Sequence, residues 1–160
     1  MLDGPSVASA LTRCGVTHVI WIPDSELGTW DAALSSTSGL TLVRVCREGE
    51  AFGVAAGLIL GGKKPIVLIQ CTGLFEAGDA LRNVVHDMKL PIFFVVGVRS
   101  YYLHQQHATA DTCPVFTEPI MKAWQVPYVL LDRSNCADDL ANAYLQARAQ
   151  GRAGAVLIAE

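Results

Sequence analysis

Residues 66–73 read Ile-Val-Leu-Ile-Gln-Cys-Thr-Gly, an apolar run that stops at polar and small residues. Consecutive apolar residues over the length of a strand are typical of strands buried on both faces, as in a parallel sheet covered by helices. Five more such runs occur, at residues 19–22, 42–46, 92–98, 128–131 and 155–158. Helical patterns alternate with them, at residues 5–13, 26–33, 50–60, 77–88, 115–124 and 137–149. The alternation predicts an α/β fold: a three-layer, doubly wound sheet of about six parallel strands.

The composition indicates one folded domain over residues 1–160. Of these residues 51% are hydrophobic and 17% are charged, which excludes an intrinsically disordered chain. The net charge of −3 gives no basic face, so we expect no nucleic-acid partner. The apolar excess is large enough that part of it is expected to cover an interface with another chain.

The sequence also favours a cytoplasmic location. The longest apolar stretches, residues 54–60 and 91–98, are far shorter than the roughly 20 residues of a transmembrane helix, and the N-terminus does not resemble a signal peptide. The five cysteines are odd in number, widely spaced and contain no CxxC pair. This pattern is typical of reduced thiols and predicts neither a disulfide framework nor a zinc site.

The fold class restricts where a ligand can bind. In open parallel sheets, ligands bind beyond the carboxyl ends of the strands. Four segments meet this condition: residues 23–25, 47–50, 70–73 and 97–107. The irregular stretch 99–114 is longer than most loops of a compact domain, so we expect it to be functional.

Three familiar kinds of site are each weakly supported. Residues 57–64 fit GxxxxGK, but they lack the final Ser or Thr and precede a strand, whereas a P-loop follows one. Cys71 could act as a nucleophile with a histidine, yet a cysteine in this position is more commonly a small buried residue. His104, His107 and Asp111 could bind a metal but lack a complete ligand set, so we expect no metal ligands in this chain.

Glu48 is the most informative single residue. It follows the second apolar run and begins a helical segment rich in small residues, from Ala51 to Gly57. The helix dipole alone would favour Glu48 and Glu50 in a first turn. It would not explain the small residues, which allow another backbone or a flat ligand to approach closely.

These residues resemble a known family. Arg47-Glu48-Gly49-Glu50-Ala51 with Ala55-Ala56-Gly57 is similar to the glutamate segment of the pyrimidine-binding (PYR) domain of thiamine diphosphate (ThDP)-dependent 2-oxoacid decarboxylases. The likeness is strongest to enzymes acting on sulfopyruvate and phosphonopyruvate. Further segments agree in order, at residues 22–25, 70–74, 96–99, 106–107, 117–120 and 126–128. The resemblance implies the ThDP-binding fold, which is flavodoxin-like, and decarboxylation of a sulfopyruvate-like 2-oxoacid.

The resemblance also implies roles for individual residues. In the family the glutamate hydrogen-bonds N1′ of the cofactor's aminopyrimidine and favours its imino tautomer, which makes Glu48 the catalytic residue. The cofactor-binding residues would be Glu48, Gln70, Thr72 and Gly73. The substrate side would be lined by Asp24, Ser25, Gln70, Phe75 and His107. Cys71, Phe75 and Glu76 depart from the Asn, Gly and Asn of related decarboxylases; Glu76, if it faced the substrate, would disfavour a dianion.

Half of the expected active site is missing from the sequence. The diphosphate-binding (PP) domain of the family carries a GDG…N motif for Mg²⁺ and diphosphate, and Gly78-Asp79-Ala80 is not that motif. The resemblance therefore implies an α subunit that acts only with a PP-domain β subunit, in a heterotetramer or larger assembly with PYR domains that homodimerise. The alternatives are another ThDP-dependent lyase or carboligase, a phosphonopyruvate decarboxylase, or a non-catalytic PYR-like regulatory or scaffold module. A flavodoxin-like nucleotide-binding module is disfavoured by the lack of a phosphate loop.

Overall fold

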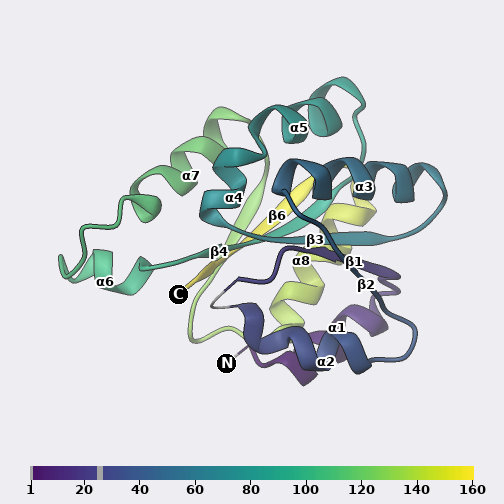
Figure 1. Cartoon of the computed structure of the whole chain (residues 1–160), viewed down its shortest axis with the longest axis horizontal. Helices are drawn as coiled ribbons and strands as arrows, with labels where there is room; N and C mark the ends of the chain where they lie inside the picture. The colour runs from purple at the N-terminus through teal and green to yellow at the C-terminus, as the bar shows by residue number, and fades with distance from the viewer. Residues whose placement is uncertain (1, 25–26) are drawn as a thin grey trace.

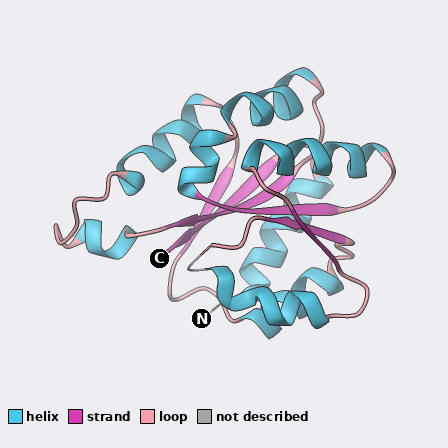
Figure 2. Cartoon of the chain, viewed as in Figure 1, coloured by secondary structure: helices cyan, strands magenta, loops and turns pink. Residues whose placement is uncertain are grey.

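The computed structural model, which describes residues 2–24 and 27–160, is built on one sheet (Figures 1 and 2). All of its strand pairs are parallel, and the strand order is β2-β1-β3-β4-β6-β5. The strands are β1 (His18–Trp21), β2 (Thr41–Arg44), β3 (Pro65–Gln70), β4 (Phe93–Val98), β5 (Tyr128–Leu131) and β6 (Gly154–Ala159). The predicted α/β class and six parallel strands are confirmed, with strand ends shifted by at most two residues.

Helices cover both faces of the sheet (Figure 1). One face carries α1 (Gly4–Arg13), η1 (Leu27–Trp30), α2 (Asp31–Ser36) and α8 (Ala137–Ala149). The other carries α3 (Glu48–Leu60), α4 (Cys71–Glu76), α5 (Gly78–Arg82), η2 (Asn83–Asp87) and α7 (Cys113–Ala123). Residues within one strand alternate between the two cores: Ile66 and Leu68 pack on the first face, Val67 and Ile69 on the second. Burial of both faces explains why the strands are continuously apolar.

The helices differ from expectation in several places. The segment after β3, for which the sequence predicted no helix, forms α4, with Gln70 as its N-cap and residues 71–73 in its first turn. The expected helix 77–88 is divided into α5 and the π-helix η2, and the long segment 99–114 contains a short helix, α6 (Tyr101–Gln105). In the part of the chain that the structure describes, no helix is long and apolar enough to cross a membrane.

The strand register brings the segments that follow β1, β2, β3 and β4 to one edge. Trp21 pairs with Arg44 on one side and with Leu68 on the other. Gln70, the last residue of β3, pairs with Gly97 of β4. The start of α3, the start of α4 and the loop after β1 therefore lie at the same end of the sheet.

Candidate active site

The first turn of α3 carries two carboxylates with different roles. Its N-cap, Arg47, has an extended backbone and no side-chain capping bond. Oε2 of Glu50 reaches back and accepts a hydrogen bond from the N–H of Cys46 at 3.0 Å. Glu50 thus stabilises the N-terminus of α3. Glu48 does not take part in this bond, so its position needs a separate explanation.

Glu48 lies directly against Gly73 of α4. A Cβ added to Gly73 would be 2.6 Å from Oε1 of Glu48 and 2.7 Å from its Cδ, closer than real Cβ atoms approach other atoms. Gly73 is buried and Glu48 is half-buried. Within the described residues, the Glu48 carboxylate has no hydrogen-bond partner, so its polar atoms are available to a ligand. A side chain at position 73 would therefore force the Glu48 carboxyl group to move from this place.

Gln70 and Thr72 lie beside this contact. Gln70 is the N-cap of α4, and the hydroxyl of Thr72 donates to its Oε1 at 3.4 Å. Between them, Cys71 is fully buried, and burial raises the pKa of its thiol to about 12. A thiol this hard to ionise is a poor nucleophile, so the structure favours the core interpretation of Cys71.

The predicted substrate residues are less closely grouped. Oδ1 of Asp24 accepts from the N–H of Leu27 at 2.8 Å in the segment after β1, and Ser25 lies outside the described residues. Phe75 is half-buried and packs against the core under α3, α4 and α7. His107 is exposed after α6, with its backbone in the left-handed region (φ 55°), and no described hydrogen bond joins its side chain to Glu48 or Gln70. Their assignment to the substrate stays a prediction.

Sequence reasoning did not find the contacts of Glu76. Its Oε1 accepts from Nε and Nη2 of Arg47 at 3.1 and 2.7 Å, and its Oε2 accepts from the N–H of Gly49 at 3.0 Å. These bonds lower the pKa of Glu76, the Gly49 N–H contributing most and Arg47 next. Glu76 therefore binds the first turn of α3, and its charge is partnered by Arg47. Because 27 residues separate it from Gly49, no local pattern could have indicated the contact.

Comparison with known proteins identifies the family. A family model described as "Thiamine pyrophosphate enzyme, N-terminal TPP binding domain" matches residues 4–118. The chain belongs to this thiamine pyrophosphate enzyme family. Glu48, Gln70, Thr72 and Gly73 all lie inside the matched segment, as do Asp24, Ser25, Phe75 and His107.

Curated proteins similar to this chain include decarboxylases and a decarboxylase subunit. Sulfopyruvate decarboxylase subunit alpha of Methanococcus maripaludis is 28% identical over 123 residues, which is 77% of this chain and 73% of that subunit. Phosphonopyruvate decarboxylase of Streptomyces viridochromogenes is 32% identical over 91 residues, 57% of this chain and 23% of the enzyme. The chain thus spans most of the first relative's length and about a quarter of the second's.

Solved structures of thiamine diphosphate enzymes share the fold. The ThDP-dependent 4-hydroxybenzoylformate decarboxylase of Rhodococcus jostii RHA1 aligns with a TM-score of 0.71 at 21% identity. Benzoylformate decarboxylase from Polynucleobacter necessarius aligns with a TM-score of 0.67, also at 21% identity. Each alignment covers 99% of this chain and 30% of the other.

The residues around Glu48 have the chemistry to contact the pyrimidine half of the family's cofactor. Glu48 is half-buried, its carboxylate has no hydrogen-bond partner among the described residues, and it lies against Gly73. Its oxygens can therefore accept a hydrogen bond from a flat nitrogen heterocycle or donate one to it. Among the described residues, no three His, Cys, Asp or Glu side chains are grouped to hold a metal ion. In the suggested metal segment, Asp111 instead accepts hydrogen bonds from Arg99, Ser100 and the N–H of Cys113.

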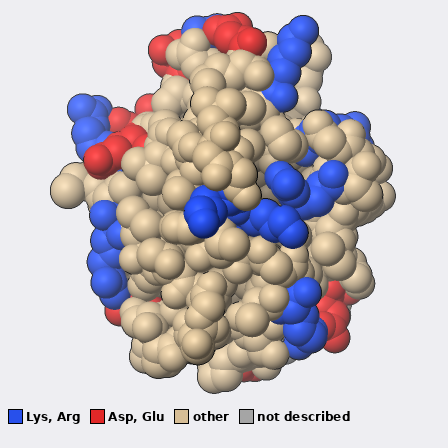
Figure 3. Space-filling model, turned by 90° about the vertical axis from the view of Figure 1, so that its right-hand side faces the viewer, with Lys and Arg blue, Asp and Glu red and all other residues tan. Residues whose placement is uncertain are grey.

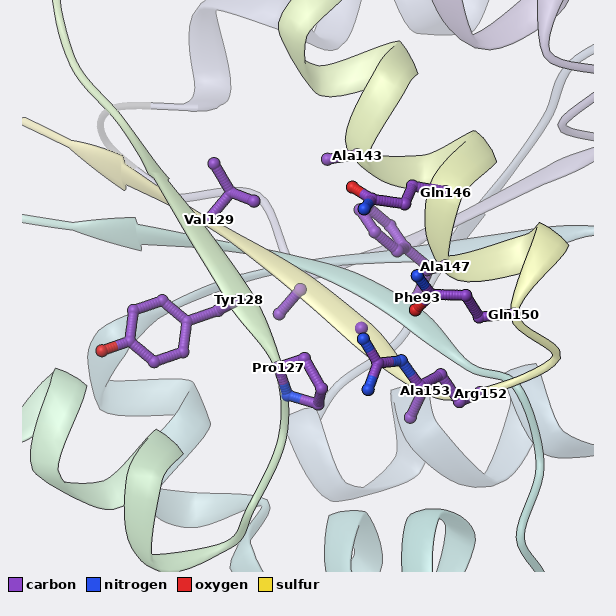
Figure 4. Close-up of a pocket in the computed structure, with 12 residues that line it drawn as sticks. Phe93, Pro127, Tyr128, Val129, Ala143, Gln146, Ala147, Gln150, Arg152 and Ala153 are labelled. Atoms are coloured by element: carbon purple, nitrogen blue, oxygen red, sulfur yellow. The ribbon is translucent and has the colours of Figure 1, made fainter.

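Other hollows and charges lie apart from this site. A cavity of about 220 Å³ is lined by β5, β6 and the last turns of α8, with the side chains of Arg152, Gln146 and Gln150 around it (Figure 4). None of the predicted site residues lines it.

Figure 3 views the side where α3 ends and β3 begins, and shows lysines and arginines near its centre. Residues 57–64 end α3 and lead into β3 there, so they do not form a phosphate loop.

Proposed function

We propose that this chain is the cofactor-activating subunit of a thiamine diphosphate-dependent 2-oxoacid decarboxylase, with a sulfopyruvate-like substrate. The observation that carries the proposal is the placement of Glu48, whose hydrogen-bonding oxygens have no described partner and whose side chain lies against Gly73. The family match and the alpha-subunit relatives support it independently. Phosphonopyruvate decarboxylation is the second candidate, since an enzyme of that name is 32% identical over the matched segment.

In this proposal, each part of the site has a distinct task. The cofactor, when bound, supplies the carbon nucleophile and the electron sink that decarboxylation requires. Glu48 holds a proton at N1′ of the aminopyrimidine, and Gln70, Thr72 and Gly73 form the surface on which that ring rests. We assign Asp24, Ser25, Gln70, Phe75 and His107 to the substrate side, where they orient the 2-oxoacid and exclude water.

The proposal requires a partner chain. We expect a PP-domain β subunit to provide the ligands for Mg²⁺ and the diphosphate, in a heterotetramer or larger complex in which PYR domains pair. The name "subunit alpha" of the relatives supports a divided enzyme. We expect the complex in the cytoplasm, since the five cysteines are free thiols that suit a reducing compartment.

The test of the proposal is Glu48→Gln, with Glu50→Gln as the matched control in the same helical turn. The amide is nearly isosteric but cannot provide the same charge-assisted bond to a ring nitrogen. We expect the rate of hydrogen–deuterium exchange at C2 of bound ThDP to fall by about 100-fold or more in Glu48→Gln, where each tenfold corresponds to about 1.4 kcal/mol. Glu50→Gln keeps an acceptor for the Cys46 N–H, so its exchange rate is expected to stay near that of the wild type.

The measurement is made on the assembled complex, with assembly checked by size-exclusion chromatography. An unchanged exchange rate in correctly assembled Glu48→Gln would refute the role of Glu48. Equal slowing in both variants would show that only the helix terminus matters. Either result would remove the main support for the proposed function.

A further inference from the structure

One side chain is bound to the residues on both sides of Glu48. Oε1 of Glu76 accepts from the guanidinium of Arg47, and its Oε2 accepts from the N–H of Gly49. Arg47 is the N-cap of α3, and Glu48 and Gly49 are its first two residues. Because Glu76 is the last residue of α4, it joins the end of α4 to the start of α3.

This contact supplies a cap that α3 does not provide for itself. The first N–H groups of a helix have no partner within the helix, and the Arg47 side chain offers no acceptor. Glu76 fills that role from another helix, and its negative charge lies at the positive end of the α3 dipole. A bond from a backbone N–H to a carboxylate is charge-assisted and stronger than a neutral one.

Two residues of α4 act together on Glu48. Gly73 and Glu76 are three positions apart, so they lie on the same side of α4. Gly73 contacts the Glu48 side chain, while Glu76 binds the side chain of Arg47 before it and the backbone N–H of Gly49 after it. The Glu48 side chain is thus confined by α4, and its backbone is held by the same helix.

We propose that Glu76 is a positioning residue, which aims the Glu48 carboxylate by capping Gly49 while Arg47 holds its other oxygen. The inference rests on the proposed function, in which Glu48 activates the cofactor. The Arg47 side chain is 76% exposed and the Glu76 side chain 35%, and solvent-exposed ion pairs contribute little to stability. The main effect of Glu76 therefore lies in the placement of Glu48, with a smaller effect on the free energy of unfolding.

Three substitutions separate the capping bond from the charge. Glu76→Gln keeps an oxygen that can accept from Gly49 and removes the charge. Glu76→Asp keeps the charge but is one methylene shorter, so it cannot reach Gly49 and Arg47 together. Glu76→Ala removes both contacts. Asp79→Ala is the matched control, because Asp79 is an exposed carboxylate on the adjacent helix paired with Arg82.

We expect C2 hydrogen exchange of bound ThDP in the assembled complex to slow by about tenfold or more in Glu76→Ala and Glu76→Asp, since small misplacement of a reacting group is costly. Glu76→Gln should stay within about threefold of the wild type, and Asp79→Ala should be unchanged. The second readout needs no cofactor. Amide hydrogen exchange of Gly49 in the cofactor-free complex should be faster in Glu76→Ala and Glu76→Asp than in the wild type, and unchanged in Glu76→Gln.

The outcomes distinguish this inference from the proposed function. If Glu48→Gln slows C2 exchange and neither Glu76→Ala nor Glu76→Asp does, Glu76 is not a positioning residue and the function stands. Equal slowing in the Gln variant would also overturn the inference, because Gln retains the acceptor. If Glu48→Gln has no effect, both proposals fail. Should Glu76→Ala not assemble, Glu76→Asp and the Gly49 exchange measurement decide.

Discussion

At the scale of single residues, the site depends on the absence of a side chain at position 73. The Glu48 carboxyl group lies in the space that a Cβ of residue 73 would need. Gly53, on the helix that Glu48 begins, has no atom within 4 Å of its added Cβ. The two glycines therefore differ within this chain: Gly73 permits a close approach of Glu48, whereas a Cβ at Gly53 would meet no other atom of the chain.

Gly73→Ala is expected to displace the Glu48 carboxylate and to slow C2 hydrogen exchange of bound ThDP by about 100-fold, because a shift of about 1 Å is enough for such a loss. The added methyl in a packed position should also lower the free energy of unfolding by about 1–3 kcal/mol. Gly53→Ala is the control and should keep or raise that free energy, by up to about 1 kcal/mol. Urea unfolding and C2 exchange measure the two effects; a normal exchange rate in Gly73→Ala would mean that Glu48 has room to move.

At the scale of elements, Asp111 connects the end of β4 to the start of α7. Its Oδ1 accepts from the N–H of Cys113, the first residue of α7, and its Oδ2 accepts from Arg99 and Ser100 just after β4. These bonds lower the pKa of Asp111 to about 2, the Cys113 N–H contributing most. The carboxylate of Asp111 thus joins the two ends of the segment 99–114.

This linkage predicts a stability difference that depends on pH. Asp111 has a depressed pKa when folded and a value near 4 when unfolded, so its contribution is complete above about pH 5 and is lost as the pH falls toward 2. Asp111→Asn should therefore be less stable than the wild type at pH 7, by on the order of 2 kcal/mol, and the difference should shrink at pH 3.

Denaturant unfolding of both chains at pH 7 and pH 3 measures this difference. Asp87→Asn is the control, since Asp87 forms an exposed ion pair with Arg82 on the neighbouring helix. A difference between wild type and Asp111→Asn that stays constant over this range would show that ionised Asp111 does not stabilise the fold.

At the scale of the whole molecule, the proposed function requires a surface that a partner chain can cover. In the proposed function, Glu48, Gln70, Thr72 and Gly73 contact the pyrimidine half of the cofactor, and a partner chain contacts the rest. Several large apolar side chains are exposed on α6 and α7, the helices that follow the carboxyl end of β4: Leu103, Val115 and Phe116. An assembly would bury such residues, since the cores of subunit interfaces are more apolar than ordinary surface.

The purified chain should bind ThDP and Mg²⁺ weakly by itself and tightly once a PP-domain chain is added, because the proposed function assigns the diphosphate and Mg²⁺ contacts to that partner. Isothermal titration calorimetry of the chain alone, of the partner alone and of the mixture measures this. We expect micromolar or tighter binding only for the mixture. Micromolar binding by this chain without a partner would contradict a divided active site.

The apolar runs by themselves determined the class of the fold. The residues of β3 and β4 are apolar at nearly every position, which only a sheet covered on both faces accommodates. Glu48 could also be singled out, because it follows such a run and begins a helix rich in small residues. These inferences succeed because a strand that is buried on both faces is apolar at consecutive positions.

Only the tertiary structure decided how the site is held together. Residues 71–76 form a helix whose packing on α3 brings Gly73 to Glu48 and Glu76 to Gly49. In the same way, Asp111 reaches Arg99 across a loop. These contacts join residues 12 to 27 positions apart, so they depend on where the sheet places each element and cannot be predicted from a local sequence pattern.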